Sequence, residues 1–125
     1  LPQGIAWLTS EADAAAAAAH EGRPVMLYFW QERCPVCRRL EASTFRAPGV
    51  LQESKRFVAV KFDGTDARAA HVKAVLEKYR VRGFPTIVFI SADGRVLYER
   101  TVVGYVDAEH LAGLMRTVPA SSAGG

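Results

Sequence analysis

The stretch that decides the fold runs from residue 25 to residue 39 and reads Val25-Met-Leu-Tyr-Phe-Trp-Gln-Glu-Arg-Cys34-Pro-Val-Cys37-Arg-Arg39. Its first six residues are apolar without interruption, which is typical of a strand that is covered on both faces of a sheet. Two cysteines, three residues apart, follow where a helix should begin, because Pro35 suits a first helical turn. The pattern predicts a buried strand that leads to a C-x-x-C pair at a helix start.

The segments on either side alternate between helical and strand patterns. Capping residues and apolar spacing predict four helices, which begin at Ser10, Cys34, Asp66 and Asp107, the second of them reaching residue 46. Further strands are expected over residues 57–62, 86–90 and 96–103, with Asp93-Gly94 as the hairpin turn before the last one. The strand–helix–strand unit requires a parallel pair, and the hairpin adds antiparallel strands. The sequence therefore predicts an α/β fold with a central mixed β-sheet flanked by helices on both faces.

Length and composition favour one small domain. The 125 residues suit a single domain over residues 1–118, followed by a short flexible tail of small and polar residues over 119–125. The first residue is Leu1, without a basic leader, which favours a mature protein or an excised domain. The net charge of +3 is mild, and only Arg33, Arg38 and Arg39 cluster, so no nucleic-acid partner is expected.

The two cysteines narrow the chemistry. A structural zinc site needs four ligands. The chain has no second cysteine pair, and its three histidines are scattered along the sequence, so no metal is expected. Haem attachment requires His directly after the second cysteine, where Arg38 stands. A redox pair or two inert thiols remain, and C-x-x-C beside a βαβ pattern favours the redox pair. Such a pair needs no cofactor beyond its own disulfide.

Cys34 is expected to form a stabilised thiolate. It lies at a helix start, where unpaired N–H groups and the helix dipole favour an anion. Arg33, Arg38 and Arg39 add positive charge, which Glu32 partly offsets. Cys37 follows one helical turn later and can close a small disulfide ring with Cys34.

Glu41 is an acid on a helix face that should be buried. At 100° per residue it lies about 40° from Cys37, between Leu40 and Phe45. An ionised carboxylate is costly to bury, so Glu41 could take up and pass on a proton. Alternatively, its side chain reaches the edge of the core and pairs with Arg38. Helix geometry leaves both possibilities open.

Several stretches together resemble a known superfamily. They are residues 22–27, the Cys34–Cys37 motif with Glu41 and Thr44-Phe45, and residues 62–66, 81–86 and 103–109. In this order they resemble the thioredoxin superfamily, and most closely the C-terminal, periplasmic gamma domain of the DsbD family of thiol:disulfide interchange proteins.

The resemblance implies roles for individual residues. Cys34 would be the nucleophile and Cys37 the resolving thiol, and Glu41 matches an acid of the DsbD-type domain that would transfer protons. Pro85 would be cis beside the cysteine pair, although most X-Pro bonds are trans. The Phe84 backbone would then hold a partner chain like an added strand. The substrate-binding surface would also include Arg33, Pro35 and Val36.

Three features of the sequence depart from the family patterns. Arg33 replaces the usual Trp before the first cysteine, which changes the docking surface. The dipeptide Pro35-Val36 differs from the commoner Val-Ala and from the Gly-Pro of thioredoxin, and this dipeptide helps to set the reduction potential. Tyr28 stands where ordinary thioredoxins have a buried Asp.

The expected function is that of an extracytoplasmic thiol–disulfide reductase. It would relay electrons through Cys34 and Cys37 from a membrane donor of the DsbD type to disulfide-containing proteins or domains. A periplasmic location, possibly as a domain of a membrane protein, follows from the same resemblance. The alternatives are a disulfide oxidase or isomerase, and a non-catalytic binding module whose cysteines only close the loop.

Overall fold

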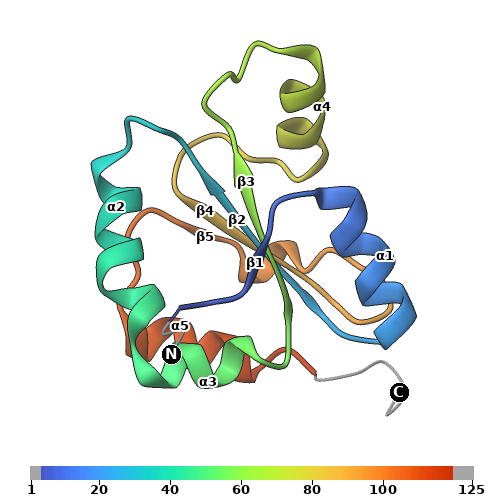
Figure 1. Cartoon of the computed structure of the whole chain (residues 1–125), viewed down its shortest axis with the longest axis vertical. Helices are drawn as coiled ribbons and strands as arrows, with labels where there is room; N and C mark the ends of the chain where they lie inside the picture. Colours follow the sequence, from blue (N-terminus) through green and yellow to red (C-terminus); the bar gives the residue numbers. More distant parts are fainter. Residues whose placement is uncertain (1–3, 120–125) are drawn as a thin grey trace.

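The computed structural model describes residues 4–119 and contains one five-stranded sheet in the order β1-β3-β2-β4-β5 (Figure 1). The strands are β1 (Trp7–Leu8), β2 (Val25–Trp30), β3 (Val58–Asp63), β4 (Thr86–Ile90) and β5 (Val102–Val103). β1 and β2 both pair with β3 in parallel, whereas β4 is antiparallel to β2 and to β5. The predicted mixed sheet is confirmed, with β2 at its centre.

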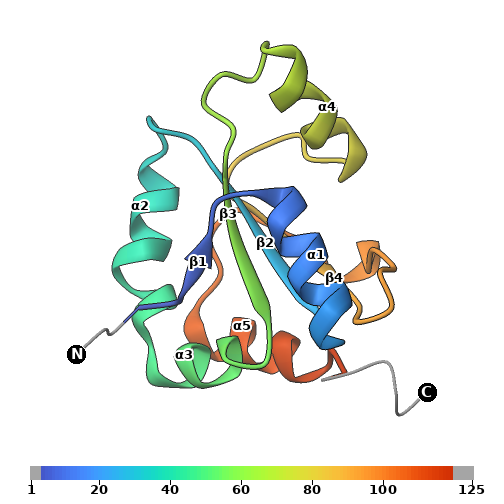
Figure 2. The ribbon, with the colours of Figure 1, turned by 45° about the vertical axis from the view of Figure 1, so that its right-hand side comes forward.

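Helices cover both faces of this sheet (Figure 2). The helices are α1 (Glu11–Glu21), α2 (Pro35–Ala42), α3 (Pro48–Ser54), α4 (Ala70–Lys78) and α5 (Ala108–Arg116). The buried residues of α1 and α4 share one core cluster with the sheet, and those of α2, α3 and α5 share the other. Among the described residues, no helix is long and apolar enough to cross a lipid bilayer.

β2 is apolar throughout because it faces both cores. Val25, Leu27 and Phe29 belong to the cluster under α1 and α4, and Met26 and Tyr28 belong to the cluster under α2, α3 and α5. Successive side chains of a strand point to opposite faces, so a central strand with two covered faces needs no polar residue. The prediction from the uninterrupted apolar run is confirmed.

The helix predicted over residues 34–46 is shorter than expected. α2 ends at Ala42, and residues Thr44–Arg46 form a 3₁₀ turn. The hydroxyl of Thr44 donates to the Val106 carbonyl at 2.7 Å, a contact with a distant segment that the local pattern did not reveal. Pro48 begins α3, because proline is well suited to the first helical turn. This helix was not predicted.

The remaining predictions for local structure were partly right. Ser10 and Asp107 cap α1 and α5 through hydrogen bonds to backbone N–H groups, as expected. Asp66 does not cap α4, which begins at Ala70. The strand expected over residues 96–103 is interrupted by a 3₁₀ turn, and only β5 remains of it as a strand. β1 was not predicted, because two residues are too few to show the alternation of apolar and polar side chains that indicates a strand. Apart from Pro119, the predicted tail lies outside the described residues.

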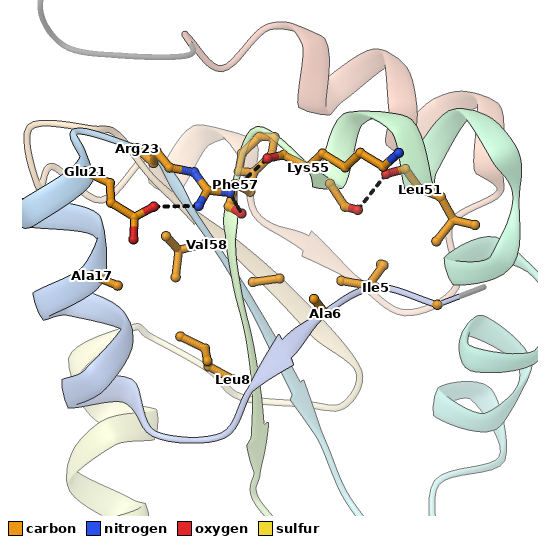
Figure 3. Close-up of a pocket in the computed structure, with 13 residues that line it drawn as sticks. Ile5, Ala6, Leu8, Ala17, Glu21, Arg23, Leu51, Lys55, Phe57 and Val58 are labelled. Carbon is orange, nitrogen blue, oxygen red and sulfur yellow. Dashed lines mark hydrogen bonds and ion pairs between the residues drawn. The ribbon is translucent and has the colours of Figure 1, made fainter. Parts of the chain in front are cut away.

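A cavity of about 820 Å³ lies between α1 and α3, at the amino ends of β2 and β3 (Figure 3). On its rim, the Arg23 guanidinium donates to the carbonyls of Lys55 and Phe57 at 2.9 and 2.5 Å, close after the end of α3. The cysteine pair follows the carboxyl end of β2 instead. The length of β2 therefore separates this cavity from the C-x-x-C motif.

Candidate functional site: the cysteine pair and its surroundings

Cys34 and Cys37 form a disulfide at the start of α2, with their Cα atoms 5.2 Å apart. Cys34 is the N-cap residue, and its Sγ accepts a hydrogen bond from the Cys37 N–H at 3.1 Å. Pro35 occupies the first helical turn, where no hydrogen bond is lost. The N–H group that contacts Cys34 Sγ would also contact a thiolate at the same position, because helix N-termini stabilise anions.

The two cysteines differ in burial. Cys34 is 7% exposed and Cys37 is 1% exposed. Arg33 and Pro35 are exposed on either side of Cys34, whereas Val36 is half-buried. A partner therefore reaches Cys34 first, and Cys37 lies behind it in the core.

The loop that leads into Cys34 is fixed by the loop after β3. The Gly64 N–H donates to the Trp30 carbonyl at 2.7 Å, and the Gln31 side-chain amide donates to the Gly64 carbonyl at 3.0 Å. The Glu32 N–H donates to the Thr65 hydroxyl at 2.8 Å. These contacts hold residues 30–32 before the cysteine motif begins.

The Phe84–Pro85 peptide bond is cis, as the resemblance implied. Pro85 is buried, and its carbonyl accepts a hydrogen bond from the Gly104 N–H at 2.9 Å. The half-buried Phe84 side chain packs against both core clusters, one of which contains Cys34 and Cys37. This loop and the cysteine motif therefore border the same part of the core.

Gly64 is closely covered by the Phe84 ring. A Cβ atom at Gly64 would lie 2.5 and 2.7 Å from two atoms of that ring. We expect Gly64→Ala to displace Phe84 and to slow reduction of protein disulfides about tenfold, while a small disulfide reagent reacts as before. Parallel assays with insulin and with 2-hydroxyethyl disulfide check this. Gly94→Ala, at a distant turn, is a control for general loss of stability, and equal slowing with both substrates would contradict the prediction.

Glu41 lies at the edge of the core rather than inside it. Its side chain is 34% exposed, which fits the alternative in which it reaches the edge of the core. The partner expected there is wrong, because Arg38 donates to the Glu32 backbone carbonyl instead. Glu41 accepts a hydrogen bond from the Tyr28 hydroxyl at 2.7 Å and forms an ion pair with Lys61 at 3.5 Å.

Tyr28 and Lys61 were missed as part of this site. They are paired across β2 and β3, and both side chains reach Glu41 on α2. Burial, followed by the hydrogen bond to ionised Glu41, raises the pKa of Tyr28. The phenol therefore stays protonated and remains a donor to Glu41 across the physiological pH range. In the sequence, the one sign of this arrangement was Tyr28 at the position where ordinary thioredoxins have a buried Asp.

Glu41 is open to solvent on its other side. Together with Lys61 and Arg46 it lines a pocket of about 300 Å³, whose apolar wall includes Trp7 and Phe45. The Tyr28 hydroxyl also lies 3.4 Å from the Cys37 carbonyl oxygen. Glu41 thus stands one helical turn from Cys37 and faces this solvent-filled pocket on its other side.

Within residues 4–119, no group of three or more His, Cys, Asp or Glu side chains is placed to hold a metal ion. A mixed sheet that presents a C-x-x-C disulfide at a helix start, beside a cis-proline loop, defines a thioredoxin-fold domain of the thiol–disulfide oxidoreductase class. The family model described as a thioredoxin-like domain matches residues 11–119, and the chain belongs to that family.

Curated relatives and solved structures agree with this assignment. The thiol:disulfide interchange protein DsbD of Klebsiella pneumoniae is 37% identical over 107 residues, which are 86% of this chain and 18% of the relative. The DsbD of Cronobacter sakazakii is also 37% identical, over 78% of this chain and 17% of the relative. The chain thus spans less than a fifth of the length of these relatives.

Two solved structures show the same fold. A thioredoxin from Thermus thermophilus superposes with a TM-score of 0.77 at 26% identity, covering 98% of this chain and 94% of that one. The oxidised DsbD C-terminal domain of Neisseria meningitidis gives a TM-score of 0.75 at 24% identity, covering 91% of this chain and all of that one (100%).

Proposed function

We propose that this domain is an extracytoplasmic protein-disulfide reductase. The observation that carries the proposal is the Cys34–Cys37 disulfide, with its outer sulfur at a helix start and its inner sulfur in the core. Similarity to proteins named as thiol:disulfide interchange proteins supports exchange between thiols and disulfides. The reducing direction and a periplasmic location within a longer membrane protein are part of the proposal and follow from the resemblance to the DsbD family. Its electrons would come from a membrane donor of the DsbD type.

The reaction begins with the reduced cysteine pair. The Cys34 thiolate attacks one sulfur of a partner disulfide, so that a mixed disulfide forms and one partner thiolate leaves. Cys37 then gives up its proton and attacks Cys34 Sγ, which restores the Cys34–Cys37 disulfide and releases the second partner thiolate. Two electrons pass to the partner, and the two partner thiolates take up protons.

Glu41 would accept the proton from Cys37. It lies one turn further along α2, where it accepts a hydrogen bond from the Tyr28 hydroxyl and pairs with Lys61. The pocket beside it gives a proton taken from Cys37 a route to bulk water.

The reduction potential of the pair tests the direction of the reaction. We expect equilibration with glutathione or dithiothreitol buffers to give a potential near that of thioredoxin, about −270 mV, together with rapid reduction of insulin. A potential near that of DsbA, about −120 mV, would indicate an oxidase instead. A disulfide that is reduced but does not exchange with any protein substrate would indicate a binding module.

A further inference from the structure

We propose that the face around Cys34 selects partners whose disulfide is flanked by acidic residues. This inference rests on the proposed function and names the chemistry of the partner. It follows from the exposed arginines of this face, whose charge can act on a partner as well as on the Cys34 thiolate.

Four exposed arginines lie within the cysteine motif, on the helix that it opens and in the segment that leads to the cis proline. Arg33 precedes Cys34, Arg38 and Arg39 lie on the first turns of α2, and Arg82 precedes the Phe84–Pro85 loop. Within residues 4–119, none of the four forms an ion pair with a carboxylate. Ion pairs to Asp or Glu are formed instead by Arg23, Arg56, Lys61, Lys78, Arg95 and Arg100.

Nearby carboxylates such as Glu32 offset only part of this charge. Glu41 is engaged by Lys61, and Asp107 pairs with His110. Glu32 is the acid within the motif's own loop, and it is Glu32's backbone carbonyl that accepts from Arg38, at 2.7 Å. That contact uses one of the five N–H donors of the Arg38 guanidinium, so the others remain free for a partner.

The arginines border an apolar centre. Val103 is 68% exposed and Tyr105 is 41% exposed, and the Gly104 N–H bonds the Pro85 carbonyl between them. Arg39 lies over the Tyr105 ring, with its Cζ 4.4 Å from the ring centroid. An apolar centre with a charged rim is the usual anatomy of a protein interface.

This anatomy favours an acidic protein segment as the occupant. Arginine binds carboxylates in a bidentate geometry, and clustered charge of one sign accelerates encounters with opposite charge by about 10- to 1,000-fold. A nucleic acid or an anionic lipid would meet the same charges but would bring no disulfide to Cys34. Arg33 is the neighbour of the reacting Cys34 in the chain, and Arg38 and Arg39 follow in the same helix, so acidic groups that flank the partner's disulfide would meet them.

Three cyclic peptides of equal length test the proposal, each with one disulfide flanked by Glu, Gln or Lys. The reduced domain transfers two electrons to each peptide, forming its own Cys34–Cys37 disulfide and the peptide dithiol. At about 10 mM salt we expect the Glu peptide to react at least about tenfold faster than the Lys peptide. At about 1 M salt the ratio should fall below about two, because the Debye length is then about 3 Å.

Charge-reversal variants locate the effect. Arg38→Glu and Arg82→Glu should each reduce the Glu-to-Lys rate ratio at least about threefold at low salt, with rates normalised to the Gln peptide. The matched control is Arg95→Glu, which makes the same change of charge beside the Asp93-Gly94 turn, at the amino end of β2. Its ratio should equal that of the wild type, because its pair with Asp93 is exposed and weak.

The outcomes separate the two proposals. If the Gln peptide is reduced normally but the Glu and Lys peptides react equally fast, the acidic-partner proposal is wrong and the reductase proposal stands. If no peptide is reduced, both are wrong. Equal peptide rates together with binding to phosphatidylglycerol vesicles that Arg38→Glu abolishes would assign the arginines to a membrane surface, and would also overturn the proposal.

Discussion

Replacing Cys34 with serine should abolish disulfide exchange, with insulin reduction falling by about 10³-fold or more, because the attacking sulfur is lost. Replacing Cys37 with serine should instead leave Cys34 able to attack but unable to be released. The second variant should therefore accumulate mixed disulfides with its partners, visible on non-reducing gels and by mass spectrometry. The difference follows from the position of Cys34 at the helix start and of Cys37 in the core.

Alkylation of the reduced wild type provides an independent measurement. At neutral pH, iodoacetamide should label Cys34 before Cys37, because only the outer thiol is both accessible and stabilised as a thiolate. Circular dichroism of both serine variants against the reduced wild type controls for unfolding. Preferential labelling of Cys37, or trapped adducts with Cys34→Ser rather than Cys37→Ser, would reverse the assignment.

Glu41→Gln should slow the resolving step about 100-fold, the lower end of the usual contribution of a general base. Glutamine keeps the size of the side chain and can still accept from Tyr28, but it cannot take the proton of Cys37. The substitution should also change the pH dependence of this step, because glutamine does not titrate. Stopped-flow measurement of mixed-disulfide decay from pH 4 to pH 9 shows both effects.

Two variants complete this experiment. Glu77→Gln removes an exposed carboxylate from α4, on the other face of the sheet, and should leave rate and pH profile unchanged. Tyr28→Phe removes the donor to Glu41 and should produce a smaller loss of rate, since Lys61 remains. The raised pKa of Tyr28 keeps its phenol protonated, so any alkaline limb belongs to the thiols. If the pH profile of Glu41→Gln is identical to that of the wild type, Glu41 does not transfer the proton of Cys37.

The elements predicted correctly from the sequence are those with strong local signals. The uninterrupted apolar run of β2, the caps at Ser10 and Asp107, and the C-x-x-C motif at the start of α2 are each encoded within a few neighbouring residues. Periodicity and capping depend on local backbone geometry, so a single sequence is enough to reveal them. The cis bond before Pro85 came from resemblance, because base rates alone favour trans.

The partners of Glu41 depended on tertiary structure. Helical spacing placed it near Cys37, but only the register of β2 against β3 sets Tyr28 beside Lys61 under α2. Register is a long-range property, and a shift of one residue would have turned Lys61 to the opposite face. The packing of Phe84 on Gly64 likewise joins loops that are twenty residues apart in the sequence.

The sequence by itself determined the chemistry of this protein, namely two cysteines in one helical turn at the end of a buried strand. The tertiary structure decided what surrounds that chemistry. It opened Glu41 to solvent between Tyr28 and Lys61. It also joined the segment of the exposed Val103 and Tyr105 to the cis-proline loop, through the Gly104 N–H and the Pro85 carbonyl. Local backbone preferences act within a few residues, whereas these neighbours meet only when the chain packs into one sheet with two covered faces.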